Sequence, residues 1–102
     1  GRLEPAEAPL ACAHRELKEE TGCTAAKMEL LTSMWTTPGF TNEKIHIFLA
    51  TELTRGSANR ESDEFIEVVP TALTEALRMI ESGQITDGKT IIGLLFAAGF
   101  RA

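Results

Sequence analysis

The chain has 102 residues, of which 43% are hydrophobic and 25% charged, and its formal net charge is -5. This length allows one small domain, and the composition argues against a disordered chain and against a coiled coil. The acidic balance also argues against a protein that binds a nucleic-acid backbone, because such proteins gather basic patches. It still permits a phosphorylated ligand if a divalent cation lies between ligand and protein.

The first predicted element is a helix over Pro9–Thr21. Proline suits the first turn of a helix, where its missing N–H has no helical partner to lose. Leu10, Ala13 and Leu17 recur at three- and four-residue spacing and predict one apolar stripe. Gly22 follows as a stop signal for the helix.

Three strands are predicted after this helix. In KIHIFLATEL, the large apolar residues Ile45, Ile47 and Leu49 alternate with Lys44, His46 and Phe48. This two-residue period is typical of a strand. The strands are expected at Lys27–Thr36, Lys44–Leu53 and Phe65–Val69, joined by a turn-rich loop at Thr36–Glu43 and a polar loop at Thr54–Glu64.

Two helices complete the chain. Leu73–Ser82 is amphipathic, whereas Lys89–Ala98 is apolar all round and is therefore expected to be more buried. The apolar run Ile91–Phe100 is shorter than the about twenty residues that span a bilayer, so no membrane partner is expected. Cys12 and Cys23 form no Cys-x-x-Cys pair, which excludes a zinc ribbon and predicts reduced thiols in a cytoplasmic protein.

The first helix carries a cluster of carboxylates. Glu16, Glu19 and Glu20 are three and four residues apart, so all three can converge on one face. Like charges at this spacing destabilise a helix by about a few tenths of a kcal/mol unless a cation faces them, and Arg15 can offset part of this through Glu19. Oxygen ligands on one face suit Mg²⁺ or Mn²⁺. The alternative for such a cluster is a solvated helix face.

The residues around this cluster favour the metal. Residues 1–23, GRLEPAEAPLACAHRELKEETGC, resemble the Nudix box, G-x5-E-x7-R-E-U-x-E-E-x-G-U with U apolar, and match it at every fixed position. A match at so many spaced positions is far more specific than a lone glycine motif.

The resemblance implies that Glu16 and Glu20, with help from Glu19, hold catalytic Mg²⁺ or Mn²⁺ ions. Such ions neutralise phosphate oxygens and activate water, which suits hydrolysis of the pyrophosphate in a nucleoside diphosphate linked to another group. The resemblance also implies an ion pair that braces the loop against the helix. The residues that it assigns to structural support of the site are Gly1, Glu7, Arg15 and Gly22.

The rest of the chain is similar to the bacterial ADP-ribose pyrophosphatase branch of this family. Pro38 lies fifteen residues after Cys23, and the similarity includes TTPGFTNEKIHIFLA, RESDEFIEVV, ALTEALRMI and ITDGKTIIGLL. The branch implies an enzyme that converts ADP-ribose and water to AMP and ribose 5-phosphate and that is a homodimer at full length.

The branch also implies a catalytic glutamate in the loop before the last strand. Glu64, which adjoins the predicted strand, is the favoured base, with Glu61 next and Asp63 as a further candidate, because a base must reach the attacking water. The alternative is a solubilising acidic tip.

Several other residues have weaker assignments. Gly39 and Phe40 lie in a loop expected to flank the substrate. Trp35 could stack on adenine, although a strand tryptophan is more often part of the core. His46 lies on the polar side of its strand, where a surface or hydrogen-bonded role is favoured over catalysis. We assign no role to His14.

The Nudix fold is an α/β mixed sheet sandwiched between helices, and its members carry several strands before the box. This sequence shows none of them, so we expect residues 1–102 to be the C-terminal part of a single Nudix domain. Two alternatives to ADP-ribose hydrolysis stay open. One is hydrolysis of another nucleoside diphosphate derivative, such as a dinucleoside polyphosphate or NADH, and the other is a catalytically silent fragment or binding module.

Overall fold

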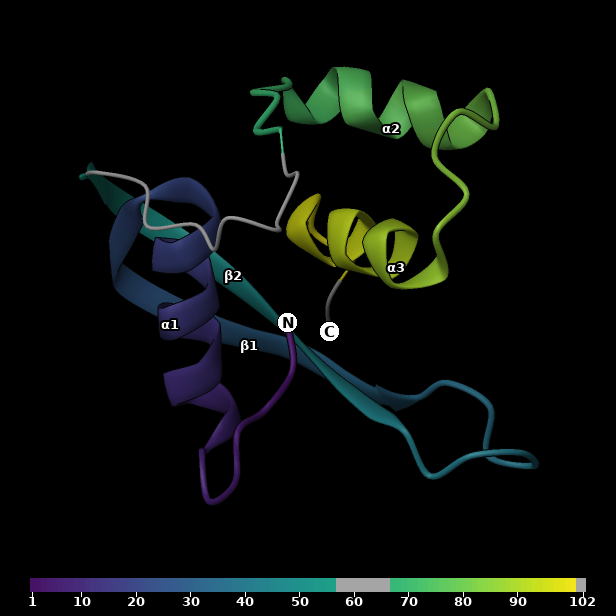
Figure 1. Cartoon of the computed structure of the whole chain (residues 1–102). Coiled ribbons are helices and arrows are strands. Elements are labelled where there is room, and N and C mark those ends of the chain that lie inside the picture. The colour runs from purple at the N-terminus through teal and green to yellow at the C-terminus, as the bar shows by residue number, and fades with distance from the viewer. Residues whose placement is uncertain (57–66, 101–102) are drawn as a thin grey trace. The chain divides into compact units, whose positions relative to one another are not determined.

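The computed structural model describes residues 1–56 and 67–100 (Figure 1). The elements in chain order are helix α1 (Pro9–Thr21), strand β1 (Cys23–Trp35), strand β2 (Lys44–Arg55), helix α2 (Leu73–Glu81) and helix α3 (Gly88–Ala97). Strands β1 and β2 pair as a two-stranded sheet. No helix within the described ranges is long and apolar enough to cross a membrane.

The chain divides into two compact units. The first unit consists of residues 1–30 and 50–68, and it therefore holds α1 with the start of β1 and the end of β2. The second unit consists of residues 31–49 and 69–102, and it holds the loop between the strands together with α2 and α3.

Both ends of α1 follow from its sequence. Pro9 occupies the start of the helix, and Gly22 ends it with a left-handed φ of 76° while its N–H donates to the Lys18 carbonyl at 2.9 Å. Glycine adopts this conformation without the steric cost that a Cβ would bring. The carbonyl of Gly22 then accepts the N–H of Gly56 at 2.9 Å, which ties the start of β1 to the residue after β2.

Three cross-strand contacts in the second unit share one register near the loop. The Thr36 N–H donates to the Glu43 carbonyl at 3.2 Å, the Ser33 hydroxyl lies 2.7 Å from His46 Nδ1, and the Lys44 ammonium lies 5.3 Å from the centre of the Trp35 ring. His46 is therefore hydrogen-bonded, as predicted.

Trp35 is not part of the core, contrary to the expectation for a strand tryptophan. Its side chain is 55% exposed, because it stands at the last position of β1 beside the loop, with the Lys44 ammonium over its ring. An amphipathic ring paired with a lysine can remain at a surface without a buried partner.

Helices α2 and α3 contact each other in the second unit. The N-terminus of α3 is capped by Asp87, whose carboxylate accepts the Thr90 N–H at 3.1 Å and the Thr90 hydroxyl at 2.7 Å. A Cβ on Gly93 would lie 3.3 Å from Ile47 Cγ2, so the absent side chain lets the α3 backbone approach β2 closely.

Two secondary-structure predictions differ from the structure. Strand β1 begins at Cys23 and not at Lys27, because Gly22 turns the chain directly from helix into strand. The strand predicted at Phe65–Val69 is wrong over residues 67–69, which are exposed and not in a strand, and its first two residues lie outside the described ranges. A strand needs a partner edge for its backbone groups, and the apolar pattern alone does not supply one.

The expectation of a buried last helix is also wrong. No residue of α3 is buried, and Leu95 is 42% exposed. Among the described residues the only buried hydrophobic side chains are those of Cys12 in α1 and Ala76 in α2, both 7% exposed. An apolar helix is buried only where enough surrounding chain covers it, which composition by itself does not guarantee.

Two glycines with open space at the Cβ position give a matched test of this backbone geometry. Gly88 begins α3 outside the left-handed region, whereas Gly83 follows α2 with a φ of +83°. We expect Gly88→Ala to raise the free energy of unfolding by about 0.4–1 kcal/mol, because it restricts the unfolded chain without strain. Gly83→Ala should lower it by about 1 kcal/mol or more, because alanine is strained there. Urea denaturation of both variants measures this, and shifts of the same sign would contradict it.

Candidate metal and phosphate site

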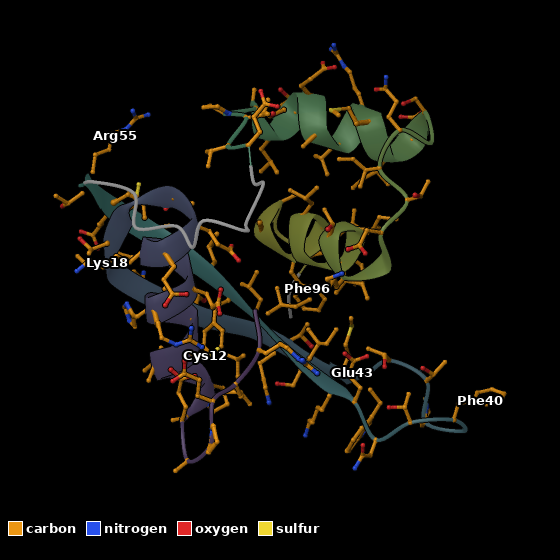
Figure 2. The ribbon with its side chains drawn as sticks, in the orientation of Figure 1. Cys12, Lys18, Phe40, Glu43, Arg55 and Phe96 are labelled. Carbon is orange, nitrogen blue, oxygen red and sulfur yellow. The ribbon has the colours of Figure 1, made fainter. Side chains whose placement is uncertain are left out.

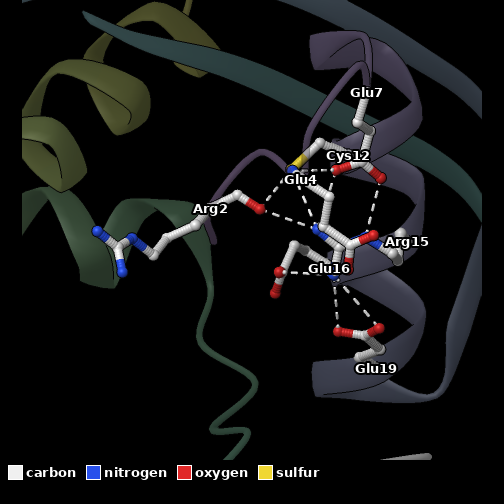
Figure 3. Close-up of polar contacts among 7 residues, drawn as sticks. All are labelled: Arg2, Glu4, Glu7, Cys12, Arg15, Glu16 and Glu19. Atoms are coloured by element: carbon white, nitrogen blue, oxygen red, sulfur yellow. Dashed lines mark hydrogen bonds and ion pairs between the residues drawn. The ribbon is translucent and has the colours of Figure 1, made fainter. Parts of the chain in front are cut away.

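One guanidinium lies at the centre of a carboxylate cluster in the first unit (Figure 3). Arg15 Nε lies 2.9 Å from Glu7 Oε2, and Arg15 Nη2 lies 3.0 Å from Glu7 Oε1. These two parallel contacts form the bidentate arrangement that makes arginine–carboxylate pairs both strong and directional. Arg15 Nη2 also donates to the Arg2 carbonyl at 2.9 Å, so the helix holds the preceding loop at two points.

A turn before α1 presents Glu7 to this guanidinium. The Glu7 N–H donates to the Glu4 carbonyl at 3.0 Å, and the Glu4 N–H donates to Glu7 Oε1, also at 3.0 Å. Pro5 and Ala6 are the central residues, and Ala6 has a φ of 63°. Proline followed by a positive φ is the pattern of a type II turn, which reverses the chain directly before the helix.

The remaining nitrogen of the guanidinium faces the helix carboxylates. Arg15 Nη1 lies 3.0 Å from Glu16 Oε1, 3.2 Å from Glu19 Oε2 and 3.3 Å from Glu19 Oε1. A fourth carboxylate, that of Glu4, approaches the same nitrogen to 3.7 Å. The spacing of Arg15 and Glu19, four residues apart on α1, places their side chains on one face.

Gly1 packs directly against this cluster. A Cβ built on Gly1 would overlap the carboxyl end of the Glu16 side chain. The absence of a side chain at position 1 is therefore what allows the loop backbone to lie against Glu16, and any larger residue would displace one of the two.

An open pocket of about 510 Å³ lies between this loop and α1. It is lined by residues of both segments, namely Gly1, Arg2, Leu3, Glu4, Pro5, Arg15, Glu16, Glu19 and Glu20. All three carboxylates that the sequence predicts as metal ligands therefore border one space.

The donor chemistry of these residues fits a hard divalent cation, because carboxylate oxygens are the ligands that Mg²⁺ and Mn²⁺ prefer. Within residues 1–56 and 67–100, no three His, Cys, Asp or Glu side chains are gathered closely enough to hold a metal ion. The carboxylates of Glu16 and Glu19 are instead bridged by Arg15 Nη1.

The ion pair controls the charge state of its members. The hydrogen bond from Arg15 holds the pKa of Glu7 at about 2, below its ordinary value of 4.5, and the Glu4 backbone N–H adds to this effect. The same pair raises the pKa of Arg15. Burial raises the pKa of the Cys12 thiol, so this free cysteine is held in its neutral form.

A family model described as NUDIX domain matches residues 1–91. The chain belongs to the Nudix domain family. It is 44% identical over 98 residues to the ADP-ribose pyrophosphatase of Bacillus subtilis (strain 168), a match that covers 94% of this chain and 53% of that protein. It is 41% identical over 98 residues to the methanol dehydrogenase activator of Bacillus methanolicus, with the same two coverages.

A third relative is the GDP-mannose pyrophosphatase of Citrobacter koseri, which is 40% identical over 87 residues, or 82% of this chain and 46% of that protein. The chain thus spans about half the length of these Nudix relatives. A solved structure titled as an ADP compounds hydrolase superimposes on 96% of this chain and 53% of its own with a TM-score of 0.84 and 24% identity, which supports the Nudix fold.

The structure brings five residues of the Nudix box into direct contact. They are Gly1, Glu7, Arg15, Glu16 and Glu19, and Glu20 borders the same pocket. Gly22 acts at the end of α1 as its cap. The box therefore forms a loop and helix joined by one arginine.

The remaining site residues lie in two predicted loops, of which the structure describes one. Gly39 and Phe40 lie in the loop between β1 and β2 in the second unit, where Phe40 is 94% exposed and projects from the loop (Figure 2). Glu61, Asp63 and Glu64 lie outside the described residues, so their role as candidate bases stays a prediction.

Three contributors to the cluster were not predicted from the sequence. The Arg2 carbonyl accepts from Arg15, while the Arg2 side chain is directed away from the cluster (Figure 3). Glu4 contributes a carboxylate and a backbone N–H, and Cys12 Sγ lies 3.7 Å from Arg15 Nη2. The spacing of Cys12 and Arg15, three residues apart on one helix face, is the one signal that could have indicated this contact.

The lowered pKa of Glu7 predicts a loss of stability in acid. The ionised carboxylate stabilises the folded state fully above pH 4.5, and this contribution is lost as the pH falls from about 4.5 toward 2. Asp87, whose hydrogen bonds with Lys89 and Thr90 lower its pKa to about 2, acts over a similar range. Urea denaturation between pH 2 and 6 should show a smaller pH dependence for both Glu7→Gln and Asp87→Asn. An unchanged pH dependence in Glu7→Gln would contradict the assignment.

Proposed function

We propose that this protein hydrolyses the pyrophosphate bond of ADP-ribose or a related nucleoside diphosphate sugar in a reaction that depends on Mg²⁺ or Mn²⁺. The products from ADP-ribose are AMP and ribose 5-phosphate. Membership of the Nudix family and the similarity to relatives named for ADP-ribose and GDP-mannose hydrolysis support the proposal. The proposal keeps the homodimer that the family resemblance implies for the full-length protein and the cytoplasmic location expected from the reduced cysteines.

The observation that carries the proposal is the carboxylate-lined pocket beside α1. Glu16, Glu19 and Glu20 border it from consecutive turns of one helix, and Glu4 borders it from the loop. These four negative charges outnumber the two arginines, Arg2 and Arg15, that line the same pocket. A phosphorylated substrate would be repelled from such a surface unless a divalent cation lay between, so the charge pattern fits a metal-bridged phosphate ligand.

The site residues divide into two groups by what they contact. Glu7 and Arg15 join the loop to the helix and hold the pocket walls together. Glu16, Glu19 and Glu20 would hold the cation, which when bound neutralises phosphate oxygens and lowers the pKa of a water. A general base would complete the reaction by taking the proton of the attacking water, and Glu64 followed by Glu61 remain its candidates.

Substitution of a proposed ligand tests the reaction. Replacing groups that only orient a metal ligand costs about 10–100-fold in activity, so we expect Glu20→Gln to lower the rate of AMP release from ADP-ribose by at least ~100-fold. Glu81→Gln, which removes a carboxylate from α2 in the second unit, is the matched control and should leave the rate unchanged. Equal rates for Glu20→Gln and wild type would reject Glu20 as a ligand.

The sugar preference is tested separately, because the relatives carry two different substrate names. We expect kcat/KM to be higher for ADP-ribose than for GDP-mannose, since the similarity is stronger to the ADP-ribose enzyme. Hydrolysis of both substrates should stop when the divalent cation is removed with EDTA and should resume when Mg²⁺ is added. A preference for GDP-mannose, for a dinucleoside polyphosphate or for NADH would overturn the choice of substrate and keep the reaction class. If the protein hydrolysed none of these compounds, the result would favour a catalytically silent binding module.

A further inference from the structure

Arg15 Nη1 occupies the position between two of the proposed metal ligands. It lies 3.0 Å from Glu16 Oε1 and 3.2 Å from Glu19 Oε2, so one nitrogen holds both carboxylates together (Figure 3). These two side chains are partly shielded from solvent, with 18% and 29% of their surface exposed. Neither the family match nor the names of the relatives says what this nitrogen does.

We infer that Arg15 Nη1 competes with the divalent cation for Glu16 and Glu19, and that cation binding displaces the two carboxylates from this nitrogen while the guanidinium stays in place on Glu7. The inference rests on the proposed function, because it concerns the same carboxylates. It gives Arg15 a second task as a positioning residue: it keeps the two carboxylates gathered and partly neutralised until a cation replaces it.

The two occupants exclude each other for reasons of charge and distance. Mg²⁺ binds carboxylate oxygens at about 2.0–2.1 Å, and it would share Glu16 Oε1 and Glu19 Oε2 with a cationic nitrogen already within hydrogen-bond distance of both. Two positive groups so close together repel each other strongly in a partly shielded site. Binding of the cation therefore favours release of both carboxylates from Nη1.

The displacement is local because the other two nitrogens of Arg15 have separate partners. Nε and Nη2 are held by Glu7 at 2.9 and 3.0 Å, and Nη2 also donates to the Arg2 carbonyl at 2.9 Å. These partners are not among the proposed metal ligands. The carboxylate of Glu4, 3.7 Å from Nη1, remains beside this nitrogen after the other two carboxylates are released.

Nitrogen-15 NMR of the Arg15 side chain, recorded on the wild-type chain during titration with MgCl₂, tests the inference directly. We expect the Nη signals to shift and to saturate with the same apparent Kd that calorimetry gives for Mg²⁺, while the Nε signal on Glu7 stays in place. Arg78, which pairs with Glu75 on the surface of α2 at 3.5 Å, is the internal control, and a KCl titration at matched ionic strength controls for screening.

A variant pair gives a second measurement. Arg15→Lys keeps the charge, but a single ammonium cannot reproduce the fork that contacts Glu7 and the helix carboxylates together. We therefore expect Mg²⁺ to bind Arg15→Lys several-fold more tightly than wild type. Lys18→Arg is the control, because it exchanges the same two residue types on the same helix. The Lys18 side chain is exposed and projects away from α1 (Figure 2), so this variant should leave the Kd for Mg²⁺ unchanged.

The outcomes separate this inference from the proposed function. Mg²⁺ binding with unmoved Arg15 Nη signals overturns the competition alone, as does equal or weaker Mg²⁺ binding by a folded Arg15→Lys variant. Movement of Nε together with Nη overturns the local displacement, since it would mean that Arg15 leaves Glu7. No Mg²⁺ binding to the wild type, with or without ADP-ribose, would overturn the competition and the metal-dependent function together.

Discussion

The bidentate pair between Arg15 and Glu7 is the interaction on which the rest of the site depends. It joins the turn of residues 4–7 to the middle of α1, and the contact from Arg15 to the Arg2 carbonyl extends that junction to the start of the chain. Because the guanidinium is planar and rigid, fixing two of its nitrogens also fixes the third. Arg15 Nη1 is thereby aimed at Glu16 and Glu19, and the geometry of the carboxylates follows from a contact made on the opposite side of the guanidinium.

This arrangement links scaffold and proposed chemistry through a single side chain. In a chain whose described part buries only two hydrophobic side chains, a hydrogen-bonded ion pair supplies order that apolar packing does not. It also concentrates negative charge at one pocket, whose lining includes four glutamates, Glu4, Glu16, Glu19 and Glu20, and two arginines. Such a surface attracts cations, which is the property that the proposed metal-dependent reaction needs.

Prediction from sequence succeeded where the signal was local. Proline and glycine mark the two ends of α1, and the apolar alternation marks β2. The ion pair of Arg15 with Glu19 was also predictable, because the two residues are four positions apart on one helix. It failed where the outcome depended on what covers an element. Trp35 and α3 have the composition of core elements, yet neither is buried. The strand expected around Val68 lacked any sequence signal for a partner edge, and residues 67–69 form no strand.

The sequence by itself determined the family, the α/β class and the identity of the carboxylates, because the spacing of the Nudix box forces Glu16, Glu19 and Glu20 onto one face of a helix whatever surrounds it. The tertiary structure decided what those carboxylates contact. The close approach of Gly1 to Glu16, the use of the Arg2 carbonyl and the bridging position of Arg15 Nη1 all depend on the path of the loop before α1. That path has no periodic pattern in the sequence, and it is set by the turn at Pro5 and Ala6 together with the ion pair that closes it.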